Sequence, residues 1–168
     1  MIKKSHFVKV RQQKLFAGLF LFSIFFSFIN LFSFININIY PEYFIALMVL
    51  IISTNLISIN ISKVFFMGVI VDILIGSILG QYTITFLLLY GLHFFSRKYF
   101  LMPTGAQAIL LKFLSTCFGI IIITIISQNF NPMFNTNGSL LNYFIIEIAV
   151  TFFILIIFQI FYERTYGT

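Results

Sequence analysis

Charged side chains are scarce in this chain of 168 residues, of which 8% are charged and 61% are hydrophobic. A soluble globular domain has about a quarter of its residues charged, because its folded surface faces water. So little charge excludes an ordinary soluble surface and requires an apolar solvent around the fold. The composition therefore predicts an integral membrane protein.

Cysteine and histidine are also scarce, which removes most metal and redox chemistry. The one cysteine, Cys117, lies inside an apolar run, so a disulfide framework and a cysteine-based metal site are both excluded. The two histidines, His6 and His93, are isolated from other metal ligands in the sequence. No motif for nucleophilic or nucleotide chemistry is present, and a lipid-modifying enzyme is disfavoured for the same reason. We expect no enzyme activity, no metal and no cofactor.

Acidic residues number four against ten Lys and Arg, and half of these basic residues lie within residues 1–14. A basic segment directly before an apolar run orients a membrane protein and contacts anionic lipid headgroups. We therefore expect membrane lipid, and no nucleic acid, as the partner of this segment. The apolar run 15–35 is too long for a signal peptide and lacks a small-residue cleavage site, which indicates a retained first helix.

Six apolar stretches, each followed by a polar or helix-breaking segment, predict an all-α bundle of six transmembrane helices. They cover residues 15–35, 43–62, 64–79, 82–95, 106–128 and 140–162. The chain then divides into a basic cytoplasmic tail (1–14), a transmembrane domain (15–162) and a cytoplasmic C-terminal tail (163–168). The third and fourth stretches are short, and both a tilted pair and a broken hairpin are compatible with their lengths.

The distribution of positive charge supports this division independently. With the N-terminus inside, the two tails, the turn at Lys63 and the loop at Arg97 and Lys98 hold nine of the ten basic residues. The tenth, Lys112, lies within snorkelling reach of the cytoplasmic interface, and the external loops hold none. Both termini are therefore predicted in the cytoplasm by the positive-inside rule.

The third stretch contains the most distinctive pattern, with Gly68, Asp72, Gly76 and Gly80 at every fourth position. In one continuous helix these residues share a face, because positions four apart lie above one another. Glycines on such a face let a neighbouring membrane helix approach closely. The pattern predicts a helix-packing or partner interface.

Three charged residues fall inside the predicted spans: Asp72, Lys112 and Glu147. A carboxylate at the middle of a membrane is costly unless it is protonated, paired or solvated inside the bundle. Asp72 could be a proton or substrate site, or a packing partner for a neighbouring helix through Asn30 or Asn55. We favour packing, because a single carboxylate makes a poor relay. Lys112 and Glu147 are expected toward opposite sides of the membrane, which disfavours a direct pair.

This part of the chain resembles the MreD family of rod shape-determining membrane proteins. The resemblance lies in Gly68 with Asp72-Ile-Leu-Ile-Gly76-Ser77-Ile-Leu-Gly80-Gln81, and in Phe100-Leu-Met-Pro103 with Ala106-Gln107-Ala108-Ile-Leu110. It covers about residues 68–110 firmly, and elsewhere only the pattern of spans agrees. The interface expected from the stripe and the resemblance comprises Gly68, Asp72, Gly76, Ser77, Gly80 and Gln81.

The resemblance implies a non-enzymatic scaffold of the cell-wall elongation machinery in the bacterial cytoplasmic (inner) membrane. Such a protein would bind MreC and link MreB filaments to peptidoglycan synthases, with RodA, RodZ and the elongation transpeptidase as further partners. The alternative is a vitamin-binding subunit of an energy-coupling-factor type transporter, which has a similar six-helix design. Those subunits usually carry an Ala-xxx-Ala pattern in the first helix, for which Ser23 and Ser27 are a weak counterpart.

Overall fold

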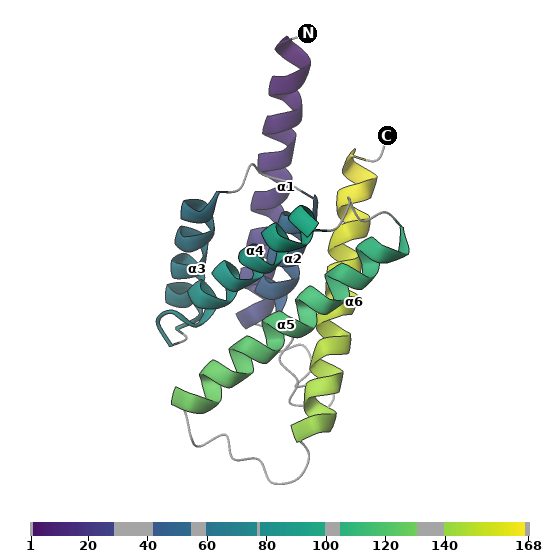
Figure 1. Cartoon of the computed structure of the whole chain (residues 1–168). Coiled ribbons are helices and arrows are strands. Elements are labelled where there is room, and N and C mark those ends of the chain that lie inside the picture. Colours follow the sequence, from purple (N-terminus) through teal and green to yellow (C-terminus); the bar gives the residue numbers. More distant parts are fainter. Residues whose placement is uncertain are drawn as a thin grey trace.

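The computed structural model describes residues 2–28, 42–54, 60–76, 78–99, 105–130 and 140–166. This part of the chain forms six helices and no strand: α1 (Ile2–Phe28), α2 (Tyr43–Thr54), α3 (Ile61–Ile75), α4 (Gln81–Tyr99), α5 (Ala106–Phe130) and α6 (Leu140–Tyr166). The all-α prediction is confirmed for the described residues. The start of α1 and the end of α6 lie at the same end of the bundle, and the turn between α3 and α4 lies toward the opposite end (Figure 1).

Helix α3 differs from its predicted bounds at both ends. It begins directly after Asn60, whose side chain accepts a hydrogen bond from the backbone N–H of Lys63 at 3.3 Å. Because this N-cap satisfies a free donor of the first turn, Lys63 belongs to α3 and the predicted break there is wrong. The helix ends at Ile75, short of the predicted stretch 64–79, because Gly76 takes a left-handed conformation that closes it.

Other helices keep their predicted places but extend further. Helix α1 already begins at Ile2, so the basic segment is helical, and residues 29–35 of the first stretch lie outside the described residues. Helix α4 continues to Tyr99 through positions where the sequence predicts a loop, and α5 and α6 end at Phe130 and Tyr166. Backbone hydrogen bonds propagate a helix through polar residues as well, so hydropathy indicates the apolar part of a helix and not its ends.

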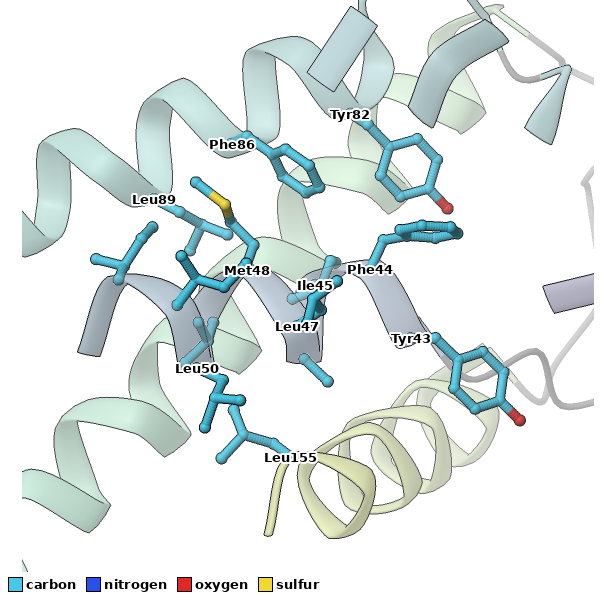
Figure 2. Packing of buried hydrophobic residues seen from close by; sticks show 14 of the residues in the cluster. Tyr43, Phe44, Ile45, Leu47, Met48, Leu50, Tyr82, Phe86, Leu89 and Leu155 are labelled. Carbon is cyan, nitrogen blue, oxygen red and sulfur yellow. The ribbon is translucent and has the colours of Figure 1, made fainter. Parts of the chain in front are cut away.

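Helix α2 forms the centre of the bundle. It carries no charged residue, and every side chain from Tyr43 to Ile52 is buried. Its neighbours are α1, α4, α5 and α6. Figure 2 shows Phe44 of α2 facing Tyr82 of α4, with ring centroids 6.1 Å apart in an edge-to-face arrangement. A helix that is apolar on all sides needs an apolar environment, either a protein core or lipid, and the central position of α2 provides the first. Residues 55–59 of the second predicted stretch lie outside the described residues.

The surface of the bundle is apolar, while several polar side chains are buried. Phe66 on α3, Ile73 on α3 and Phe153 on α6 each expose more than 60% of their surface, at 63%, 66% and 62%. Asp72 and Gln81, in contrast, are buried. A soluble protein has the opposite distribution, because burying polar groups and exposing large apolar ones both cost free energy in water.

Two helices in the described part of the chain are long and apolar enough to cross a membrane. These segments are Ala106–Asn129 in α5 and Phe144–Thr165 in α6. Helix α2 is apolar but shorter in its described part, at Tyr43–Thr54. The prediction of six spans therefore stays a prediction for the remaining helices.

Candidate functional site at the α3–α4 hairpin

Asp72, near the end of α3, is the buried carboxylate around which the candidate site is built. Its Oδ1 accepts a hydrogen bond from the backbone N–H of Tyr82 at 2.8 Å. Its Oδ2 accepts from the N–H groups of Gly80 (3.0 Å) and Thr83 (3.2 Å) and from the Thr83 hydroxyl (2.6 Å). These N–H groups belong to the start of α4, where a helix leaves its donors without internal partners. Asp72 therefore caps α4 and places its negative charge at the positive end of the α4 dipole.

Glycines decide how closely α3 and α4 meet at this hairpin. Gly68 lies so near α4 that a Cβ added to it would stand 2.4 Å from the Cα of Thr83. Gly76 and Gly80 adopt positive φ angles of 67° and 100° and reverse the chain between the two helices. The prediction that Gly68, Asp72, Gly76 and Gly80 form one helical stripe is therefore wrong beyond Asp72, because Gly76 ends α3.

Gln81 and Tyr82 extend the site to the other helices. The Nε2 of Gln81 donates a hydrogen bond to the hydroxyl of Ser127 on α5 at 2.7 Å. The Tyr82 hydroxyl donates to Oε2 of Glu42, directly before α2, also at 2.7 Å. The backbone N–H of Glu42 donates in turn to the hydroxyl of Thr151 on α6 at 3.1 Å. One polar network around the first turn of α4 thus joins five helices.

Glu42 is a functional candidate that the sequence analysis does not single out. It lies in the link before α2, outside the predicted spans. Burial raises the pKa of its carboxyl from the ordinary 4.5 to about 7, and the hydrogen bond from Tyr82 opposes this rise. Glu147 of α6 is near enough for the two carboxyl groups to interact electrostatically. The arrangement can therefore hold a proton on Glu42 at neutral pH. The signal in the sequence is an acidic residue directly before a helix without polar interruptions.

The geometry of the network suits a brace between helices. Its hydrogen bonds join residues of different helices, and four of them run from the start of α4 to the carboxylate of Asp72. This favours packing over a proton or substrate site as the role of Asp72. Among the described residues, no group of three His, Cys, Asp or Glu side chains could hold a metal ion. Asn30 and Asn55, the candidate partners of Asp72, and Ser77 lie outside the described residues.

Lys112 and Glu147, the other predicted intramembrane charges, lie at different levels of the bundle. The Nζ of Lys112 on α5 donates a hydrogen bond to Oε1 of Gln159 on α6 at 2.7 Å. The Nε2 of Gln159 donates to Oε1 of Glu163 at 2.6 Å. Glu147 precedes Gln159 by about three helical turns, and its electrostatic neighbour is Glu42. The fold does not bring Lys112 and Glu147 together.

The hairpin brings together the predicted residues Gly68, Asp72, Gly80 and Gln81. Thr83 is not among the predicted residues, although a hydroxyl in the first turn after a glycine is a recognisable signal for the start of a helix.

Comparisons with protein families, with curated proteins and with solved structures find no match for this chain.

Proposed function

We propose that this chain is a multi-pass protein of the bacterial cytoplasmic membrane, with six spans and both termini in the cytoplasm. The observation that carries this proposal is the apolar outer surface of a bundle whose polar network is buried. Soluble monomers rarely expose apolar patches of more than a few hundred Å². The start of α1 and the end of α6 lie at the same end of the bundle in Figure 1, which fits an even number of membrane crossings. The placement of the basic residues in the sequence supports the same orientation.

We further propose that the protein is a non-enzymatic scaffold of the cell-wall elongation complex, as the resemblance to MreD implies. Helix α3 supports this role, because among the described helices it packs chiefly on α4, while several of its large apolar side chains are exposed. Phe66, Ile70 and Ile73 follow one another at helical spacing and are exposed by 63%, 47% and 66%. The Asp72 cap holds α3 firmly on α4 and so presents this face at a fixed position.

The outer face of α3 suits a partner that contributes a single transmembrane helix. Association of helices in lipid is driven largely by van der Waals packing, which needs a surface of defined shape. In the proposed assembly MreC packs on this face. Through that contact the protein joins the rest of the proposed complex, which comprises RodA, RodZ, the elongation transpeptidase and MreB.

Site-specific photocrosslinking in native membranes tests the scaffold. A photoreactive residue at Ile73 on α3 should capture MreC, because this position lies on the proposed contact face. The matched control is the same residue at Ile125 on α5, an isoleucine that is also exposed, by 53%. Capture at both positions with equal yield would show that the contact is not on α3. No capture of MreC at either position would contradict the proposed partner.

A pull-down of the tagged protein in mild detergent separates the scaffold from the transporter alternative. We expect the elongation synthases and MreC among the bound proteins. Recovery of an ATPase pair with a coupling subunit would instead identify a vitamin-binding transporter subunit and overturn the scaffold.

A further inference from the structure

A groove of about 190 Å³ lies between α5 and α6. Its apolar wall consists of Ile109 from α5 and Phe152, Leu155, Ile156 and Ile160 from α6. Ile156 and Ile160 expose 39% and 57% of their surface, so the groove opens to the outside of the bundle. Pockets for compact small molecules usually exceed about 300 Å³. The groove is therefore better suited to a segment of a long apolar chain than to a whole compact ligand.

A row of polar side chains lines the same groove: Lys112, Gln159 and Glu163. Gln159 is held with its amide oxygen toward Lys112 (2.7 Å) and its amide nitrogen toward Glu163 (2.6 Å). An ammonium group has more donors than this one bond uses. In the described part of the chain, Glu163 is connected to Lys112 through Gln159 and not by a bond of its own. Lys112 therefore keeps hydrogen-bonding capacity for an anion at the groove.

Lys112 also borders a second and smaller cavity, of about 10 Å³, together with Ser53, His93 and Ser115. A space of this size holds about one water molecule. Of these two spaces beside Lys112, the groove between α5 and α6 is therefore the one with room for an anionic group.

We propose that the α5–α6 groove binds one anionic phospholipid, with part of an acyl chain against its apolar wall and the phosphate on Nζ of Lys112. This proposal rests on the membrane location proposed above. The predicted topology places Lys112 within snorkelling reach of the cytoplasmic headgroups, where anionic lipids lie. A cation at this depth is stabilised by a nearby anion, and a phosphate in the groove would supply that charge by a direct bond, whereas Glu163 is connected to Lys112 through Gln159.

Native mass spectrometry of the full-length protein tests the groove, after exchange with vesicles of phosphatidylglycerol or of phosphatidylcholine. We expect one retained phosphatidylglycerol, and retention about tenfold or more above that of phosphatidylcholine, because the choline cation of the latter offsets the charge of the same phosphate group beside Lys112. Lys112→Gln should abolish this preference, whereas Lys112→Arg should keep it. A Lys112→Gln variant with the wild-type preference, or a wild-type protein without any preference, would overturn the proposal.

A second pair of variants tests the apolar wall separately from the charge. Ile156→Trp places a larger side chain in the groove. It should reduce retention of the bound lipid at least about tenfold, because the acyl chain then loses the apolar surface that it covers on the groove wall. Ile121→Trp is the matched control, because Ile121 lies on α5 outside the groove and is exposed by 40%, against 39% for Ile156. Equal retention in the two variants would indicate only a general lipid coat and overturn the site.

The outcomes also separate this proposal from the proposed function. A protein that stays in solution without detergent or membrane would remove the membrane location and the groove together. Retention of phosphatidylglycerol without crosslinking to MreC would leave the lipid site intact and overturn only the scaffold. Crosslinking to MreC without a preference for phosphatidylglycerol would overturn the lipid site and leave the scaffold intact.

Discussion

Asp72→Asn should destabilise the α3–α4 hairpin, because an amide can accept hydrogen bonds at only one of its two terminal atoms, whereas a carboxylate accepts at both. With the amide oxygen at the Oδ2 position, the bonds from Gly80 and Thr83 survive. The amide nitrogen then faces the N–H of Tyr82, which now lies 2.8 Å from a carboxylate oxygen. Two donors cannot satisfy each other, so this buried N–H loses its partner.

The loss can be estimated from the bonds that change. Leaving a buried partner of a charged group unsatisfied costs about 1.5–3 kcal/mol. Removing the negative charge from the start of α4 adds about 0.3–1 kcal/mol. We therefore expect Asp72→Asn to lower the free energy of unfolding by about 3 kcal/mol, or the unfolding midpoint by about 6–12 °C for a chain of this size. Thr83→Val removes only the hydroxyl bond to Asp72 and should cost about 1 kcal/mol.

The single cysteine provides the assay. Cys117 is partly buried on α5, so its reaction with a thiol-sensitive dye in detergent solution reports unfolding as the temperature rises. Glu163→Gln is the control, because it makes the same change of carboxylate to amide at an exposed residue and should cost less than about 0.5 kcal/mol. The capping role is refuted if Asp72→Asn and Glu163→Gln unfold at the same temperature.

Three further predictions use the same protein. Gly68→Ala should lower the free energy of unfolding by about 2 kcal/mol, because its Cβ would stand 2.4 Å from the Cα of Thr83. Gly76→Ala should lower it by about 1 kcal/mol, because alanine is strained at the positive φ of this position. Equal losses of stability in the dye assay would favour a continuous helical stripe. The contribution of Glu42 to stability should be greatest below pH 4.5 and fall by up to about 3 kcal/mol as the pH rises to 7 and above, because the pKa of Glu42 is about 7 in the folded protein and 4.5 when exposed. Thermal midpoints across this range should show the fall in the wild type and a flatter curve in Glu42→Gln, and parallel curves would contradict the buried carboxyl. A reporter fused after Thr168 should be active only in the cytoplasm, and activity on the outside would contradict six spans.

The order and approximate positions of the helices could be predicted from the sequence, because apolar stretches and the polar breaks between them are local features. The central position of α2 is compatible with its composition, since Tyr43–Thr54 offers no polar face to water. The spacing of Gly68, Asp72 and Gly80 predicts one helical stripe, whereas in the structure only Gly68 and Asp72 lie on α3 and Gly80 lies in the turn. Glycines at every fourth position look alike in a helix and in a turn that follows it, so the spacing does not distinguish the two.

Local patterns could not identify the partners in the polar network. Tyr82 and Glu42 are 40 residues apart, and Glu42 and Thr151 are 109 residues apart, yet each pair shares a hydrogen bond. Lys112 likewise meets Gln159 only because α5 crosses α6. The sequence by itself determined the apolar composition, the helices and the distribution of basic residues that predicts their orientation. Only the tertiary structure decided that Asp72 caps α4, because the turn after Gly76 brings its carboxylate to the first N–H groups of the next helix. It also decided that Glu42 is buried, because helices distant in the sequence exclude water from it.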